Sequence, residues 1–190
     1  MIVDFFRHRR FYEEEPEVSG IGEGVSPKAI NDTIHGVIHV DGAREELLST
    51  PEFNKLSHIK QLGLAHLVFP GAHHTRFEHS LGVSHLGSMM ADSVGLDTHE
   101  KKLVETAAML HDVGHGPYSH TLEHILHSRG GMDHMTVTEG IITGEYDVLR
   151  EGEQDVFSER MSVPEIIEKH DMDPKDVANL IRGPDAGGSE

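Results

Sequence analysis

A histidine followed directly by an aspartate, His111-Asp112, ends an apolar stretch and precedes two glycines and a proline. Two further histidines, His115 and His120, follow in the same segment, which reads HDVGHGPYSH. Imidazole nitrogen and carboxylate oxygen are ligands that suit divalent metals, and additional imidazoles can donate or accept protons near neutral pH. The spacing therefore predicts a hydrolytic site with a metal ion at one corner.

Two helices are expected to position this site. One runs from about Glu100 to Asp112 and is stopped by the glycines and proline that follow. The other follows a Pro-Gly break and places four residues on one stripe that should face the core: His79, Val83, Leu86 and Met90. Neighbouring helices pack about 8–10 Å apart, so one ion could join His79 to His111. The alternative is that each histidine is a buried core residue held by hydrogen bonds.

The rest of the chain is predicted to be mainly helical, with a short strand or hairpin near the N-terminus. Residues 33–40, TIHGVIHV, alternate β-branched and polar side chains. Helical spacing follows and is interrupted near Thr50-Pro51. Further on, Ser162 and Glu165 have the spacing of a capping box, and Asp173-Pro174 should start another short helix.

The composition excludes several classes of protein. A formal net charge of −17 without a basic stripe argues against nucleic acid as a partner, although a metal and a few local cations could still bind a small anion. Because the chain has no cysteine, it can hold neither a disulfide nor a thiolate metal site. No apolar run is long enough to span a membrane, and the N-terminus does not have the pattern of a signal peptide. We therefore expect a soluble, cytoplasmic protein.

Three segments are expected along the chain of 190 residues. Residues 1–30 are rich in Glu, Gly, Pro and Ser and should form a flexible acidic segment. Residues 31–182 should form one helical domain, and the Gly-rich residues 183–190 a disordered tail.

Two segments, HTRFEHSLGV at residues 74–83 and HDVGHGPYSH at residues 111–120, resemble the HD-domain metal phosphohydrolases. The likeness covers about residues 31–142 and is strongest to the branch that contains the dNTP triphosphohydrolases. It implies an all-α HD-domain helical bundle with a short N-terminal β-hairpin. It also implies one divalent metal ion with three ligands in this chain: His79, His111 and Asp112. Imidazole and carboxylate ligands admit Fe, Mn, Zn, Ni or Mg.

The same resemblance implies roles for further residues. Four match catalytic positions: His115, His120, Glu123 and His134. His115 and His120 match the histidines that line the phosphate end of the pocket, and His134 matches another active-site histidine. Glu123 would orient His120, since side chains three residues apart meet on one helical face and a carboxylate raises the basicity of the imidazole that it holds. Three match positions that contact the nucleotide: Gln61, Leu62 and Arg76. Of these, Arg76 suits bidentate phosphate recognition.

The reaction implied is metal-assisted hydrolysis of a nucleotide, which in the triphosphohydrolase branch converts a dNTP to a deoxynucleoside and triphosphate. The spacing alone supports only a metal-dependent phosphoester or phosphoanhydride hydrolase. Two alternatives remain: a phosphohydrolase for another small phosphate ester, and a catalytically weak module that binds metal or nucleotide. Relatives of this branch commonly assemble, so a homo-oligomer is among the expected states.

Two departures from the family pattern favour the binding module. The family's last metal-binding Asp belongs to a motif of closely spaced aspartates followed by Tyr-Leu, and nothing after Asp155 matches it. Four later aspartates are at predicted helix ends or in the tail: Asp171, Asp173, Asp176 and Asp185. We therefore expect a longer protein or a natural truncation. In addition, Met135 follows His134 where many relatives carry a Glu.

Overall fold

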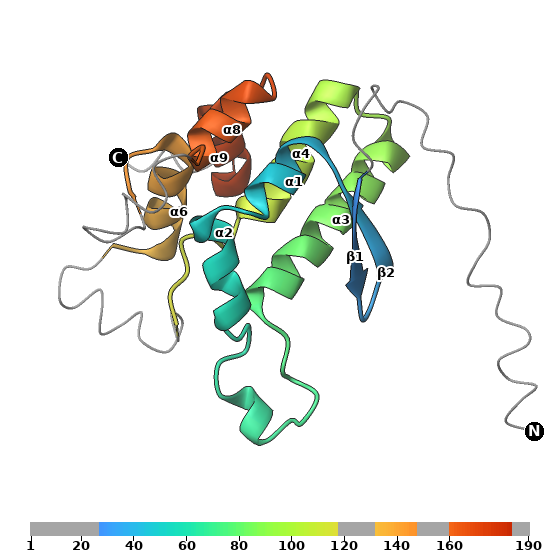
Figure 1. The fold of residues 1–190 in the computed structure, drawn as a ribbon, viewed down its shortest axis with the longest axis vertical. Coiled ribbons are helices and arrows are strands. Elements are labelled where there is room, and N and C mark those ends of the chain that lie inside the picture. Colours follow the sequence, from blue (N-terminus) through green and yellow to red (C-terminus); the bar gives the residue numbers. More distant parts are fainter. Residues whose placement is uncertain (1–26, 118–131, 148–159, 184–190) are drawn as a thin grey trace, which may run out of the picture.

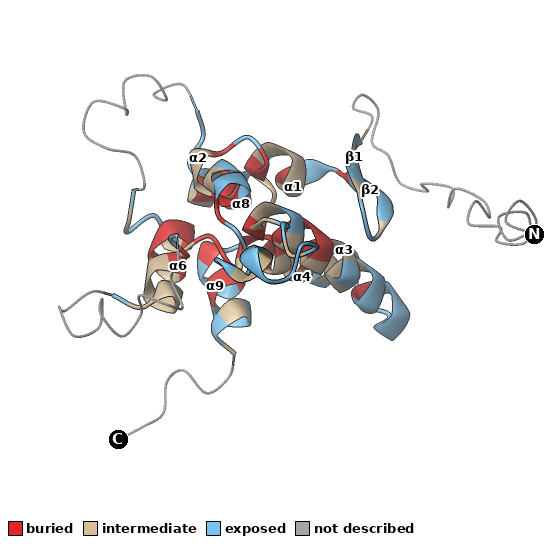
Figure 2. Cartoon of the chain, turned by 90° about the horizontal axis from the view of Figure 1, so that it is seen from below, coloured by how far each residue is buried: buried red, intermediate tan, exposed pale blue. Residues whose placement is uncertain are grey.

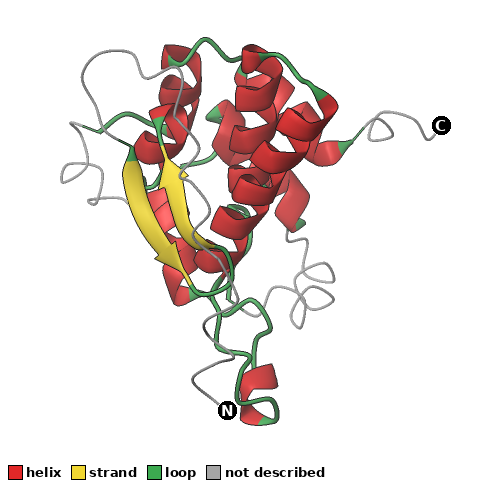
Figure 3. Ribbon diagram, turned by 90° about the vertical axis from the view of Figure 1, so that its right-hand side faces the viewer, coloured by secondary structure: helices red, strands yellow, loops and turns green. Residues whose placement is uncertain are grey.

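The computed structural model describes residues 27–117, 132–147 and 160–183. In this part of the chain, helices pack around one core, and the strands form a single two-stranded hairpin at its side (Figures 1 and 3). This arrangement confirms the predicted all-α class with a short N-terminal β-hairpin. No helix in the described ranges is long and apolar enough to cross a bilayer.

The hairpin pairs β1 (Lys28–Asp32) with β2 (Gly36–Val40) in antiparallel register, with Lys28 opposite Val40. Its turn is fixed by the Asp32 carboxylate, which accepts hydrogen bonds from the backbone N–H groups of Ile34 and His35, each at 2.8 Å. We expected the domain to begin at residue 31, but β1 begins at Lys28. The reason is that Lys28 pairs with Val40, the last residue of β2.

Two short helices follow the hairpin, α1 (Gly42–Leu47) and α2 (Pro51–Asn54), and a 3-10 turn, η1 (Lys55–His58), follows them. The predicted interruption is at Thr50. Its hydroxyl donates to the carbonyl of Leu47 at 2.8 Å and accepts from the N–H of Phe53 at 3.3 Å. The hydroxyl therefore joins the end of α1 to the start of α2.

A loop that contains the 3-10 turn η2 (Ala65–Leu67) projects away from the helices before α3 begins (Figure 1). Its ends are held together by hydrogen bonds from Gln61 N to His74 O (3.1 Å) and from Arg76 N to Ile59 O (2.8 Å). Its tip carries exposed apolar side chains, including Val68, which is 75% exposed.

The two longest helices, α3 (Arg76–Val94) and α4 (Thr98–Leu110), lie side by side and form a helical hairpin (Figure 1). A left-handed glycine, Gly95 (φ 74°), ends α3. Both helices begin with a capping box, Thr75 with Glu78 and Asp97 with Glu100.

One expectation for α3 was wrong. Leu86 and Met90 do not face the core but are 45% and 67% exposed. The side of α3 that is buried carries small and polar residues, and a Cβ placed on Gly87 would lie 3.4 Å from Cβ of Ala108 on α4. Close approach of the two backbones therefore orients α3, and the larger apolar residues of its C-terminal half are directed to solvent (Figure 2).

Three further described helices are α6 (His134–Thr143), α8 (Val163–Lys169) and α9 (Pro174–Arg182). Of these, α9 packs on α4, and α6 packs on both α9 and α8. The predicted starts of α8 and α9 are confirmed by the Ser162–Glu165 capping box and by Asp173, which accepts from Lys175 N at 2.8 Å. The core is formed by apolar residues from most of these elements, among them Ile38, Leu47, Phe53, Met109, Ile142 and Ile167.

Candidate metal centre

The first turn of α3 and the C-terminal end of α4 meet at the predicted metal site. The Thr75–Glu78 capping box fixes where α3 begins, so His79 lies one turn into the helix. At the other side, α4 ends at Leu110, and His111 is its C-cap. The chain then continues in tight turns, with hydrogen bonds from Val113 N to Leu110 O and from His115 N to Asp112 O, each at 3.0 Å.

The three predicted ligands converge. The Nε2 atoms of His79 and His111 lie 3.3 Å apart, Nε2 of His111 lies 3.4 Å from Oδ1 of Asp112, and the three ligand atoms all lie within 4.8 Å of one another. Metal–ligand bonds of about 2.0–2.2 Å place neighbouring ligand atoms about 2.8–3.6 Å apart at octahedral or tetrahedral angles. The separations of 3.3 and 3.4 Å therefore match those of neighbouring ligands of one divalent ion.

The hydrogen bond of His111 also suits metal binding. Its Nδ1 lies 2.7 Å from the carbonyl oxygen of Ala108. A carbonyl only accepts hydrogen bonds, so Nδ1 is the donor and Nε2 is the ring nitrogen that faces His79. Burial, supported by the neighbouring charges of His111 and Arg76, lowers the pKa of His79 despite the opposing effect of Asp112. The neutral form of His79, which a metal requires, is therefore favoured.

The carboxylate of Asp112 is shared between two sides of the site. Oδ2 accepts a hydrogen bond from Nη1 of Arg76 at 2.6 Å, and Oδ1 lies 3.4 Å from Nε2 of His115. Burial of Asp112 opposes its ionisation, but the adjacent His111 and the guanidinium of Arg76 outweigh it and hold the pKa of the carboxyl below its usual value. Asp112 is therefore an anion and can serve as a metal ligand.

Arg76, which the resemblance places in contact with the nucleotide, lies against a candidate metal ligand. Its side chain is only 3% exposed and is paired with Asp112. Sequence reasoning missed this ion pair. The spacing of three residues between Arg76 and His79 places both on one face of α3, and this spacing could have indicated that Arg76 lies near the candidate ligands.

His115 and His134 are brought together beside Asp112. Their rings are stacked, with centroids 4.1 Å apart and an interplanar angle of 18°. Gly114 allows this approach, since a Cβ at that position would overlap the carbonyl of His134 and the side chain of Thr138. The N–H of Gly114 also donates to the hydroxyl of Thr138 at 3.0 Å. The start of α6 thus packs directly on the segment that follows α4.

Gln61 and Leu62 lie at the base of the projecting loop, next to the start of α3. The side-chain oxygen of Gln61 is buried and has no hydrogen-bond partner among the described residues, and Leu62 is 53% exposed. A buried amide oxygen without a donor is unfavourable by itself, so this position suits contact with a ligand. His120 and Glu123 lie outside the described residues.

No described aspartate adds a fourth ligand to the cluster of His79, His111 and Asp112. Asp173 caps α9, and Asp171 lies in the turn before it with a positive φ of 61°. Asp185 lies outside the described residues.

Comparison with known proteins agrees with this site. The sequence model of the HD domain matches residues 76–182, more than half of the chain. The chain belongs to the HD domain family. The match includes all three ligands and every described helix from α3 onward, and HD domains bind divalent metals.

Several relatives match this HD-domain chain over part of their own length. An uncharacterized protein of Bacillus subtilis, YwfO, is 43% identical over 127 residues, 64% of this chain and 28% of the relative. Human SAMHD1, a deoxynucleoside triphosphate triphosphohydrolase, is 43% identical over 103 residues, 50% of this chain and 16% of the relative. A crystal structure of a hypothetical protein from Aquifex aeolicus has 37% identity and a TM-score of 0.61, covering 82% of this chain and 37% of that chain. The chain thus spans about a quarter of YwfO and less of SAMHD1.

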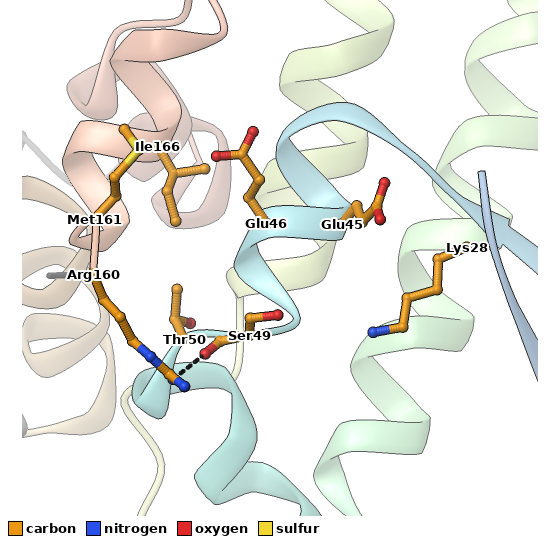
Figure 4. Close-up of a pocket in the computed structure, with 8 residues that line it drawn as sticks. All are labelled: Lys28, Glu45, Glu46, Ser49, Thr50, Arg160, Met161 and Ile166. Atoms are coloured by element: carbon orange, nitrogen blue, oxygen red, sulfur yellow. Dashed lines mark hydrogen bonds between the residues drawn. The ribbon is translucent and has the colours of Figure 1, made fainter. Parts of the chain in front are cut away.

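A cavity of about 360 Å³ lies apart from the metal ligands, between α1 and the start of α8 (Figure 4). Its lining carries charges of both signs, Lys28 and Arg160 with Glu45 and Glu46. Arg160 donates to the carbonyl of Ser49 at 2.8 Å and so joins the two sides. The described residues that line the cavity include no histidine, so its chemistry differs from that of the metal centre.

Proposed function

We propose that this HD-domain protein is a metal-dependent phosphohydrolase that acts on nucleotides and releases triphosphate from dNTPs. The observation that carries the proposal is the convergence of His79, His111 and Asp112 at metal-ligand spacing. The substrate class is supported by the identity of 43% to human SAMHD1 over half of the chain.

Each residue of the site has a role in this proposal. His79, His111 and Asp112 would hold the ion, which when bound supplies Lewis acidity to a phosphoryl oxygen and an activated water. His115, next to Asp112 and stacked on His134, would move a proton during attack or departure of the leaving group.

The remaining roles concern the substrate and the outer part of the site. Gln61 offers an unpaired oxygen to the nucleotide, and Leu62 an exposed apolar surface beside it. We assign His120 and Glu123 to the same proton-handling group on the basis of the family resemblance. The partner is then a small-molecule nucleotide, and we propose a homo-oligomer as the working assembly.

A second candidate is a module that binds metal or nucleotide with little turnover. It is favoured by the three-ligand cluster, to which the described aspartates add no fourth member. An open coordination position is sufficient for binding, whereas catalysis also requires a correctly placed water and acid.

Metal analysis combined with a product screen tests the proposal. Metal-stripped protein is loaded with Mn²⁺, Fe²⁺ or Zn²⁺ and assayed for phosphate, pyrophosphate and triphosphate released from dNTPs, NTPs and monophosphates. We expect triphosphate from dNTPs, and its loss in Asp112→Ala. The matched control is Asp92→Ala, which removes an exposed carboxylate of α3 paired with Lys101 at 2.6 Å.

Other products would select the other candidates. Phosphate released from monoesters would replace the dNTP substrate with a small phosphate ester. Bound metal without any product, in a chain extended past residue 190 as well, would select the binding module.

A further inference from the structure

We propose that Arg76 is a positioning residue for the metal ligand Asp112, which it holds by one oxygen so that the other is presented to the ion. The inference rests on the metal centre of the proposed function. Nη1 of Arg76 donates to Oδ2 at 2.6 Å, while Oδ1 lies 3.4 Å from Nε2 of His111 and from Nε2 of His115. The two oxygens of one carboxylate thus face different groups, and only Oδ1 faces the imidazole ligand at metal-ligand spacing.

The start of α3 places Arg76 accurately for this role. Arg76 is the first residue of the helix, directly after the Thr75 cap, and its N–H donates to the carbonyl of Ile59 at 2.8 Å. His79 follows three residues later on the same face. One helical turn therefore supplies a metal ligand and also the group that orients a ligand from another helix.

Because the Arg76–Asp112 pair is buried, we expect it to orient the carboxylate more than to stabilise the fold. The side chains of Arg76 and Asp112 are 3% and 8% exposed. Removing two charges from water costs about as much as their attraction returns, so such a pair adds little net stability. An arginine stays charged at all physiological pH values, and its planar fork fixes the direction of the carboxylate. Ligating carboxylates are themselves commonly held by hydrogen bonds that tune metal affinity.

Metal affinity of the full 190-residue chain tests the inference without turnover. Isothermal titration of metal-stripped protein with Mn²⁺ should show a loss of about 10- to 100-fold in Arg76→Gln. The matched control is Arg44→Gln, which removes another arginine paired with carboxylates, Asp41 and Glu105, away from the ligands. We expect this control to bind Mn²⁺ as the unmodified chain does. Equal Mn²⁺ affinity in Arg76→Gln and Arg44→Gln would overturn the inference and leave Arg76 a phosphate contact, with an effect on KM alone.

Two further variants keep the test decisive. Arg76→Lys keeps the charge but not the fork, so it should fold and lose a smaller part of the affinity; unchanged affinity would count against positioning. In the Asp112→Asn background, Arg76→Gln should add little further loss, because Arg76 acts through Asp112. Two full, additive losses would show independent roles.

The same experiments distinguish failure of this inference from failure of the proposed function. Mn²⁺ binding that depends on Arg76, without any phosphate product, would sustain this inference and remove the proposed activity. If the unmodified chain bound no Mn²⁺, both would be overturned.

Discussion

The two halves of α3 differ in which side chains they bury and which they expose. The N-terminal half buries Arg76, Ser80 and Ser84, whereas the C-terminal half exposes Leu86, Met90 and Val94. Two of these polar groups bond to other elements: Arg76 to Asp112, and Ser84 to the carbonyl of Glu105 at 2.9 Å. Large apolar groups lie outside in the C-terminal half because a glycine there brings α3 close to α4. Leu81 and Ala91 are also buried, so in this helix hydrophobicity is only one of the factors that decide burial.

Removing a ligand from the buried half should have the largest effect. We expect His79→Ala to weaken Mn²⁺ binding by at least about 100-fold, since a direct ligand contributes more than the groups behind it. The control is Met90→Ala on the exposed half, which should bind Mn²⁺ normally by calorimetry. Similar affinities in the two variants would remove the functional contrast between the halves.

A larger side chain at Gly87 tests whether close packing on α4 orients α3. Gly87→Leu inserts a side chain where even a Cβ would touch Ala108. We expect the unfolding free energy to fall by about 1–2 kcal/mol, because overpacking outweighs the higher helix propensity of leucine. Urea denaturation measures it. A stabilised variant would show that close approach does not orient α3.

Protonation of His79 should reflect its burial. Burial holds the pKa of His79 below its ordinary value, so in metal-free protein this imidazole should titrate below about pH 6.5 and stay neutral above it. A histidine NMR titration, assigned with His79→Asn, measures the midpoint. A midpoint above 6.5 would mean that the carboxylate of Asp112 outweighs burial.

The smallest effect is expected on the exposed half. Met90→Lys and Val94→Lys should each change the unfolding free energy by less than about 0.5 kcal/mol, because these side chains are 67% and 71% exposed. Thermal unfolding of the isolated chain is sufficient to test this. A loss of more than 1 kcal/mol in unfolding free energy for either variant would mean that the native side chain is packed against another surface.

The sequence was sufficient to predict three candidate ligands, which the fold brings together, and the starts of α8 and α9, because these depend on local chemistry. His111-Asp112 stands at the end of a periodic segment, and caps such as Asp173 use side chains close to the backbone groups that they satisfy. The inward face of α3 could not be predicted in this way. Leu86 and Met90 fit a helical stripe, and only the contact between Gly87 and α4 shows that the stripe points to solvent.

Side-chain pairing between different helices was the other part that the sequence did not reveal. Arg76 and Asp112 are 36 positions apart, and their contact depends on how α3 and α4 are placed against each other. The stacking of His115 on His134 similarly depends on Gly114, whose missing Cβ lets α6 approach. The sequence pattern predicts which types of residue form the site, but it does not predict which of these residues contact each other.

The tight turn at Gly95 has a consequence for how the centre is assembled. It joins α3 directly to α4, so His79 and His111, 32 positions apart, belong to one helical hairpin. Closing a short loop costs little chain entropy, and local contacts form early in folding. The three candidate ligands can therefore come together when α3 and α4 form their hairpin. The helices that follow in the chain, α6, α8 and α9, can then pack beside ligands that are already in place.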